Sequence, residues 1–294
     1  MEQTLWVTKH CASLAGKTVA ITGPTGGLGS KICRGILTAG GRLILLGRSA
    51  EKMQALKSRL LKDFPQGEIT LLSLDLADFS SVKAACQALE ALPVDILLHN
   101  AGIYDVPRYL CSTGILNIFQ VNFAAPYYMT RRLLPLLRSR RGRVTAVGSI
   151  AHRYSRTDPE DMDFRSRKHC HLIYGNSKRY LMYGLWALGR QEPLVGFSVG
   201  HPGVTVTGIS DHYPPWLYRL IKGPMQLIFM KPQKACRGIL LALSRDLPTQ
   251  CWAGPRYFDT WGNPCIRQVH TADSREQQEI SDLSRQMADR LEGM

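Results

Sequence analysis

The sequence predicts an α/β protein in which helices cover both faces of one doubly wound, mostly parallel sheet. Short apolar runs alternate with longer amphipathic stretches over the first two-thirds of the chain. The apolar runs contain few polar residues, as strands do when both faces of their sheet are covered. A strand followed by a helix and another strand forms a right-handed crossover, which leaves the two strands parallel.

The expected elements alternate regularly along the chain. Strands are expected at residues 17–23, 42–47, 69–75, 94–100, 143–149 and 196–200. Helices are expected at residues 27–40, 50–64, 79–92, 114–138, 171–190 and 274–290. In the first helix, Leu28, Ile32 and Ile36 recur at the spacing that places apolar side chains on one helix face. No linker rich in Pro, Gly or Ser interrupts the pattern, so residues 1–294 are expected to form a single domain.

The charge of the chain is strongly basic. Lys and Arg number 37 against 23 Asp and Glu, which gives a net charge of +14. Nucleic acid, an anionic membrane surface and a phosphorylated cofactor would each explain this excess. No zinc-finger spacing, RNA-binding aromatic motif or basic heptad region is present, so no nucleic-acid partner is expected. The densest basic run, residues 138–143, is interpreted as a solvated helix end, with a membrane-facing patch as the alternative.

The eight cysteines form no Cys-x-x-Cys pair. Their scatter matches neither a disulfide scaffold nor a zinc site, so reduced thiols and no metal are expected. The N-terminus does not resemble a signal peptide, and no run of 18 apolar residues is present. We therefore expect a cytoplasmic protein, with peripheral membrane association left open.

A glycine-rich turn joins the first expected strand to the first expected helix. It reads Thr-Gly-Pro-Thr-Gly-Gly-Leu-Gly over residues 22–29. Glycines here let a pyrophosphate approach the backbone, and the helix start offers free N–H groups to the anion. The residues of this turn that we expect at a cofactor are Gly23, Thr25, Gly27, Leu28 and Gly29.

The end of the second strand predicts which dinucleotide binds. An acidic residue here would bond the adenosine ribose hydroxyls of NAD and repel a 2′-phosphate. Gly47 supplies no carboxylate, whereas Arg48 and Lys52 supply cations that suit the 2′-phosphate of NADP. The sequence therefore favours NADP(H). A solvated arginine at a strand end is the alternative.

Two further strand ends are expected to border the same ligand. Asp75 and Leu76 end the third strand, where the aspartate could bond the adenine edge. Asn100, Ala101 and Gly102 end the fourth strand, where small residues would let the backbone lie against the cofactor.

Tyr174 and Lys178 are separated by four positions in an expected helix, so they share one helix face. A free tyrosine titrates at about 10, and a nearby ammonium group lowers that pKa. The pair could then act as a general acid or base toward a hydroxyl or carbonyl group. A surface pair is the alternative, but Ser149 at the end of the preceding strand favours a reactive site.

Taken together, these residues resemble the short-chain dehydrogenase/reductase family between about residues 17 and 207. The resemblance rests on TGxxxGxG at 22–29, HNAG at 99–102, Asn122, Ser149, YxxxK at 174–178 and Pro202-Gly203. It implies a Rossmann-type fold. The TGxxxGxG spacing disfavours sugar-nucleotide epimerases, which usually show TGxxGxxG.

The resemblance also implies roles for individual residues. Tyr174 would be the acid or base, and Lys178 would lower its pKa and bond the nicotinamide ribose. Ser149 would hold the substrate oxygen, and Asn122 would anchor a proton-relay water. The residues implied beside the nicotinamide are Pro202, Gly203 and Thr207.

Two features resemble the retinol dehydrogenase and WW-domain oxidoreductase branch of this family. They are the spacing of 25 residues from Ser149 to Tyr174 and the pair Ala151-His152 after the serine. The chain departs from common family patterns at four places, none of which removes a member of the tetrad. These are Pro24 and Thr25 in the turn, His99 and Gly148.

The expected function is hydride transfer between NADP(H) and a carbonyl or alcohol of a lipophilic substrate, of the retinoid, steroid or fatty aldehyde class. The apolar segment 204–232, with Trp216, would bind that substrate; membrane contact and a packed lid are alternatives for it. A non-catalytic NADP(H) sensor on the same fold is the competing function, and a homo-oligomer is left open. The domain would divide into an extension (1–16), the dinucleotide-binding and catalytic core (17–203), the substrate-binding loop (204–232), and C-terminal helices with a last strand (233–294).

Overall fold

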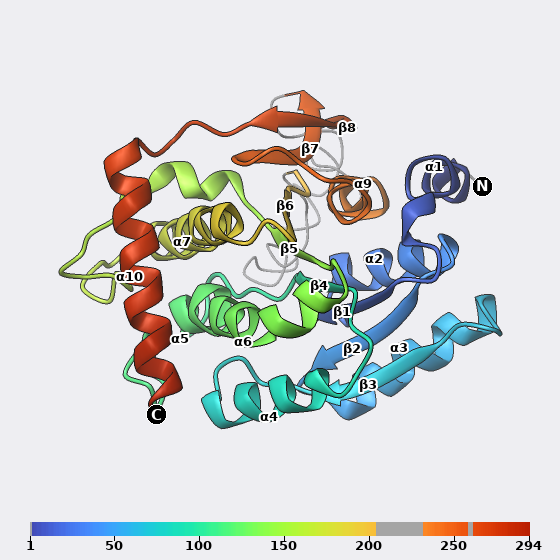
Figure 1. The fold of residues 1–294 in the computed structure, drawn as a ribbon, viewed down its shortest axis with the longest axis horizontal. Coiled ribbons are helices and arrows are strands. Elements are labelled where there is room, and N and C mark those ends of the chain that lie inside the picture. The colour runs from blue at the N-terminus through green and yellow to red at the C-terminus, as the bar shows by residue number, and fades with distance from the viewer. Residues whose placement is uncertain (1, 204–231, 258–260) are drawn as a thin grey trace, which may run out of the picture.

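The computed structural model describes residues 2–203, 232–257 and 261–294 (Figure 1). Its eight-stranded sheet has the order β3-β2-β1-β4-β5-β6-β7-β8. All neighbouring strands are parallel except β7 and β8, which are antiparallel. The predicted single-domain, doubly wound α/β fold is confirmed.

The first six strands lie close to their predicted positions. These six are β1 (Thr18–Thr22), β2 (Arg42–Gly47), β3 (Ile69–Ser73), β4 (Ile96–His99), β5 (Arg143–Val147) and β6 (Gly196–Gly200). The strands β7 (Cys251–Tyr257) and β8 (Trp261–Gln268) follow them in the sheet. The chain reverses its direction of sheet growth after β3, since β4 pairs with β1 on the side away from β2. The carboxyl ends of β1 and β4 therefore meet at the switch point where such sheets bind ligands.

Helices cover both faces of the sheet (Figure 1). The helical elements are α1 (Glu2–His10), η1 (Ala12–Leu14), α2 (Gly27–Thr38), α3 (Ala50–Asp63), α4 (Phe79–Glu90), α5 (Asn117–Phe119), η2 (Gln120–Ala124), α6 (Ala125–Ser139), η3 (Ile150–Tyr154), α7 (Cys170–Gln191), α9 (Pro232–Ser244) and α10 (Ser274–Glu292). Alternate residues of β1 enter two cores. Val19 and Ile21 pack with α2, α3 and α9, whereas Ala20 faces the core that α4, α6, α7 and α10 share.

One expected helix boundary was wrong, and the structure adds elements at two other places. The helix expected from residue 114 begins at Asn117, because Gly114 has φ +74° in a turn where Leu110 bridges Leu116. The C-terminal part contains a hairpin of β7 and β8 in place of one last strand. The N-terminal extension includes α1, whose Val7 is fully buried in the core on the α2 side.

Within the described ranges, no helix is both long enough and apolar enough to span a bilayer. The apolar segment expected to bind substrate lies outside the described residues, except for Pro232 at the start of α9. Thr207 and Trp216 lie in this part and are not placed.

Candidate active site

The glycine-rich turn lies at the carboxyl end of β1, where β1 passes into α2. Gly23 has φ +63°, a conformation that a side chain disfavours. A Cβ on Gly29, in the first turn of α2, would lie only 2.5 Å from the carbonyl oxygen of Gly23, so this position requires glycine. Gly26 precedes α2 without a side-chain cap, so the first N–H groups of the helix are available to an anion.

The other expected residues of this turn lie at its outer side. Thr25 and Gly27 are exposed, and Leu28 is half-buried against the core on the α2 side. A ligand phosphate could therefore reach the backbone from solvent without displacing packed side chains.

Asn100 supports the turn from behind. Its Nδ2 donates to the carbonyl oxygens of Thr22 and Gly23, both at 2.9 Å. In return, Thr22 Oγ1 accepts hydrogen bonds from the backbone N–H groups of Asn100 at 3.1 Å and Ala101 at 3.0 Å. The amide expected to border a cofactor thus joins the ends of β1 and β4.

Arg48 and Lys52 lie exposed beyond the end of β2. A Cβ on Gly47 would lie 3.2 Å from Met53 Sδ and 3.7 Å from Pro24 Cδ, so this strand end lies against the glycine-rich turn. Two exposed cations therefore border the turn, with no carboxylate at residue 47.

Asp75 is half-buried after β3, and its side chain is occupied locally. Its Oδ1 accepts a hydrogen bond from the backbone N–H of Ala77 at 2.9 Å, which forms an Asx turn. Leu76 is buried, and its carbonyl oxygen accepts from Gln120 Nε2 at 3.1 Å. One carboxylate oxygen of Asp75 is therefore already engaged within its own turn.

Lys178 lies on α7 beneath the carboxyl end of β5. Its Nζ donates to the carbonyl oxygen of Val147 at 3.0 Å and lies 5.7 Å from the centre of the Tyr174 ring. Burial lowers the pKa of Lys178 to about 8. Gly102 faces this ammonium group, since a Cβ on that glycine would lie 3.4 Å from Nζ.

Tyr174 lies within hydrogen-bond reach of Ser149, but its pKa does not shift in the expected direction. Burial raises the pKa of Tyr174, and a hydrogen bond with the Ser149 side chain offsets only part of that effect. The expected lowering of this pKa by Lys178 was wrong for the cofactor-free protein. Desolvation penalises the phenolate more than the nearby groups stabilise it.

Asn122 lies in a single π-helical turn, η2, between α5 and α6. Its Oδ1 accepts from the Ile103 N–H at 2.8 Å, and its Nδ2 donates to the Ile103 carbonyl oxygen at 2.8 Å and to Ser177 Oγ at 3.0 Å. π-Helical turns often occur at functional sites. A Cβ on Gly102 would lie 3.3 Å from Asn122 Oδ1, so Asn122 and Lys178 flank the same glycine.

The segment after β6 completes this edge of the site. His201 donates its backbone N–H to the Ala253 carbonyl oxygen at 2.8 Å, half-buried Pro202 follows, and Gly203 has φ +78°.

Tyr104 lies beside Tyr174 although no sequence motif includes it. Its ring meets that of Tyr174 edge to face, with ring centres 5.1 Å apart, and 41% of its surface is exposed. Burial is the main cause that raises its pKa to about 12. Its place two residues after the HNAG motif was the only signal in the sequence.

Comparison with known proteins identifies the family. Residues 17–158 match the family model for short chain dehydrogenases. Retinol dehydrogenase 14 of Mus musculus is 30% identical over 250 residues, which cover 79% of this chain and 75% of that protein. The chain belongs to the short-chain dehydrogenase/reductase family. The predicted family and its retinol dehydrogenase-like relatives are thereby confirmed, and the chain is an oxidoreductase by family.

A further relative and two solved structures are also similar to this chain. Dehydrogenase/reductase SDR family member 13 of Bos taurus is 34% identical over 232 residues, 76% of this chain and 60% of that protein. A solved structure of an uncharacterized protein from Mycobacterium paratuberculosis has a TM-score of 0.75 at 27% identity and covers 94% of both chains. A Pseudomonas aeruginosa RhlG/NADP complex has a TM-score of 0.62 at 24% identity, over 80% of this chain and 91% of that chain, which shows the shared fold.

Proposed function

We propose that this short-chain dehydrogenase/reductase is NADP(H)-dependent and interconverts a carbonyl and an alcohol on a lipophilic substrate. The observation that carries the proposal is the convergence of Ser149, Tyr174 and Lys178 at the same sheet edge as the glycine-rich turn. A structural pair on a helix surface would not require Lys178 to be almost fully buried, at 2% exposure. Strongly perturbed groups in such a place mark functional sites.

Tyr174 suits the role of proton donor in the reducing direction. Its raised pKa keeps the phenol protonated at neutral pH. Bound NADPH would supply the hydride that reduces the carbonyl carbon. Tyr174 would give its proton to the carbonyl oxygen, and the Ser149 hydroxyl would hold that oxygen in place. Oxidation of the alcohol would move the same proton back to the Tyr174 phenolate.

The residues present fit a dinucleotide. Lys178 uses one of its three N–H donors on Val147, so the others can bond ribose hydroxyls. The free N–H groups at the start of α2 suit a pyrophosphate. Arg48 and Lys52 favour the 2′-phosphate of NADP over the free ribose of NAD. Several solved structures that share the fold contain NADP or NADPH.

Two observations support a lipophilic substrate. The exposed ring of Tyr104 lies against Tyr174 and offers an apolar wall beside the reacting group. Relatives with similar sequences include retinol dehydrogenase 13 of Homo sapiens and polyprenol dehydrogenase of Mus musculus.

The first test is fluorescence titration of wild type and Arg48→Ala with NADPH and NADH. We expect NADPH to bind at least about tenfold more tightly, and the variant to lose most of that preference. Turnover of a retinal, a steroid ketone and a long-chain aldehyde with NADPH then follows, with Tyr174→Phe as the control. NADPH binding without turnover in wild type would favour the sensor. Equal binding of NADH would refute the role given to Arg48.

A further inference from the structure

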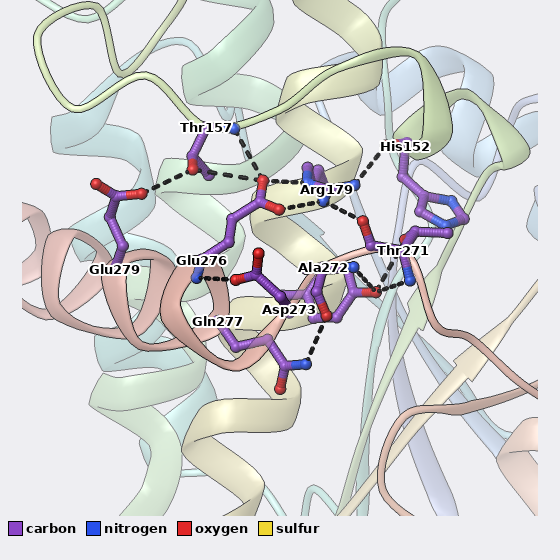
Figure 2. Close-up of polar contacts among 10 residues, drawn as sticks. His152, Thr157, Arg179, Thr271, Ala272, Asp273, Glu276, Gln277 and Glu279 are labelled. Carbon is purple, nitrogen blue, oxygen red and sulfur yellow. Dashed lines mark hydrogen bonds and ion pairs between the residues drawn. The ribbon is translucent and has the colours of Figure 1, made fainter.

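Arg179 connects three parts of the chain that are far apart in sequence. It follows Lys178 on α7, and its side chain is 1% exposed. Its Nε and Nη2 donate to the two carboxylate oxygens of Glu276 on α10, at 2.7 and 2.5 Å. Nη2 also donates to the Thr271 carbonyl oxygen at 2.5 Å, and Nη1 donates to that of His152 at 3.0 Å (Figure 2).

Glu276 extends the connection to the segment between Ser149 and α7. Its Oε1 accepts a hydrogen bond from the Thr157 N–H at 2.9 Å (Figure 2). Burial acts to raise the pKa of Glu276, but the bonds and charge of Arg179 together with Thr157 hold it below its usual value. The carboxylate is therefore charged at neutral pH, and bidentate pairing fixes its orientation.

His152 carries the connection onward to Ser149. Its Nδ1 donates to the Ser149 carbonyl oxygen at 2.5 Å. Burial lowers the pKa of His152 to about 4, so the ring is neutral and this bond fixes its tautomer with the proton on Nδ1. Arg179 therefore binds the backbone of His152, and the His152 ring binds the backbone of Ser149.

The packing around this chain of contacts leaves little freedom. The His152 ring meets Trp252 edge to face, with ring centres 5.5 Å apart. A Cβ on Gly175, the residue after Tyr174, would clash with the carbonyl oxygen of Ala151. The η3 turn therefore rests directly on α7 beside the catalytic tyrosine, and Arg179 determines how it lies there.

We propose that Arg179 and Glu276 are positioning residues that set the place of the Ser149 hydroxyl relative to the Tyr174 hydroxyl. The C-terminal helix α10 is then part of the active-site scaffold, although it begins 100 residues after Tyr174 (274 − 174). The inference rests on the proposed function. Its physical basis is that a displacement of about 1 Å at reacting groups can slow a reaction about 100-fold.

The test replaces the pair with apolar side chains of similar volume, Arg179→Met with Glu276→Leu, which avoids leaving one buried charge alone. We expect kcat to fall about 10- to 100-fold, with NADPH affinity within about twofold of wild type. Arg131→Met with Asp289→Leu is the matched control. It removes an exposed ion pair of 2.6 Å that joins α10 to α6 rather than to η3. We expect kcat of the control within about twofold of wild type.

His152→Phe tests the last link if the double variant fails to fold. It keeps a ring against Trp252 and removes the donor to Ser149. We expect the same loss of kcat. We also expect the apparent pKa in the oxidising direction to rise, because Ser149 lowers the pKa of Tyr174. A purely structural role would leave that pKa unchanged.

The outcomes separate the inference from the proposed function. Loss of kcat in the folded variants with an unchanged control supports the inference. If wild type is active, the inference is overturned when kcat of His152→Phe or of the folded double variant stays within threefold of wild type. It is also overturned when the control variant loses kcat to the same extent. If wild type binds NADPH but turns over no carbonyl or alcohol, the proposed function fails, and this inference fails with it.

Discussion

The side-chain amide of Asn100 holds the carbonyl oxygen of Gly23 at 2.9 Å and thereby joins the end of β4 to the turn after β1. A Cβ on Gly29 would lie 3.0 Å from the same nitrogen. The backbone that would receive the pyrophosphate is therefore held from behind by one amide. The conformation of the turn depends on this contact as well as on its glycines.

Asn100→Ala should weaken cofactor binding through the turn rather than through a lost ligand contact. It leaves the carbonyl oxygens of Thr22 and Gly23 without this donor, which costs about 1–3 kcal/mol in the free energy of unfolding. We expect the Kd of NADPH to rise at least about tenfold, because the turn no longer holds its binding conformation. Fluorescence titration and urea denaturation measure the two effects.

Asn117→Ala is the control for this prediction. Asn117 is 1% exposed, and its Nδ2 donates to the Pro107 carbonyl oxygen at 3.0 Å, away from the glycine-rich turn. We expect a similar loss of stability with little change in NADPH affinity. If both variants weaken NADPH binding equally, the supporting role of Asn100 is wrong.

Gly47→Asp combined with Arg48→Ala should reverse the cofactor preference. A side chain at residue 47 requires a small movement of the flexible Met53, whose Sδ would lie 3.2 Å from the new Cβ. The carboxylate would then bond ribose hydroxyls and repel a 2′-phosphate. We expect NADH to bind more tightly than NADPH in titrations. Arg59→Ala, which removes an exposed cation on α3, should leave the preference unchanged; a comparable change there would indicate a general charge effect.

The sequence predicted the parts of the site that local spacing determines. The glycine spacing predicted the turn, and Tyr174 with Lys178 predicted a shared helix face. The role of Arg179 was not predictable in this way, because its partner Glu276 is 97 residues away. Nothing near Arg179 in the sequence distinguishes it from a surface arginine, whereas the structure shows it fully buried.

The hairpin of β7 and β8 was missed for a different reason. Pro255 and Pro264 both occur in it, and proline usually argues against a strand. In the structure the two prolines face each other in the hairpin. The β6 pairing covers only Trp252 and Ala253 of β7, so the strand has already passed beyond β6 at Pro255. The missing N–H of this proline therefore costs no bond to β6.

Lys178→Met should stabilise the cofactor-free protein while abolishing turnover. Burial lowers the pKa of Lys178 from 10.5 to about 8, so the folded state binds this proton more weakly than the unfolded chain. Burying the charged ammonium group therefore lowers the free energy of unfolding by up to about 3 kcal/mol. This full cost is present below pH 8, where Lys178 is protonated in both the folded and the unfolded state. Loss of the bond to Val147 offsets part of the gain. We expect a net stabilisation of about 1–2 kcal/mol at pH 7 by urea denaturation.

The pH dependence provides the check on that explanation. Between pH 8 and 10.5 only the unfolded wild type keeps the Lys178 proton, so wild-type stability rises relative to Lys178→Met. The advantage of the variant should shrink across this window. A difference that stays constant from pH 7 to pH 10 would show that packing, and not the buried charge, explains the effect.

Tyr174 should make the two directions of reaction respond oppositely to pH. Because burial raises its pKa, the phenol stays protonated through neutral pH and supplies the proton for reduction. We expect kcat/KM for carbonyl reduction to be flat from pH 6 to 8 and to fall only in alkaline solution. For alcohol oxidation, which needs the phenolate, kcat/KM should rise steadily over the same range. Identical profiles in both directions would exclude Tyr174 as the titrating group.

Three buried histidines should make the folded protein sensitive to mild acid. Burial is the largest cause that lowers the pKa of His99 to about 3, of His152 to about 4 and of His201 to about 3. In the unfolded chain each titrates at about 6.5, so below that pH the unfolded state binds up to three more protons than the folded state. Stability should therefore fall as the pH decreases from 6.5, by up to about 4 kcal/mol per pH unit.

His201→Phe tests this explanation without removing the ring that stacks on Trp252, at a centre-to-centre distance of 4.5 Å. One of the three proton-binding differences named above disappears, so the joint contribution of these histidines to the slope of unfolding free energy against pH should fall by about one third between pH 6 and 5. This window lies above the range where carboxylates titrate strongly, so they contribute little. His169→Phe changes an exposed histidine and should leave the slope as in wild type. An unchanged slope in His201→Phe would mean that this ring binds its proton equally in both states.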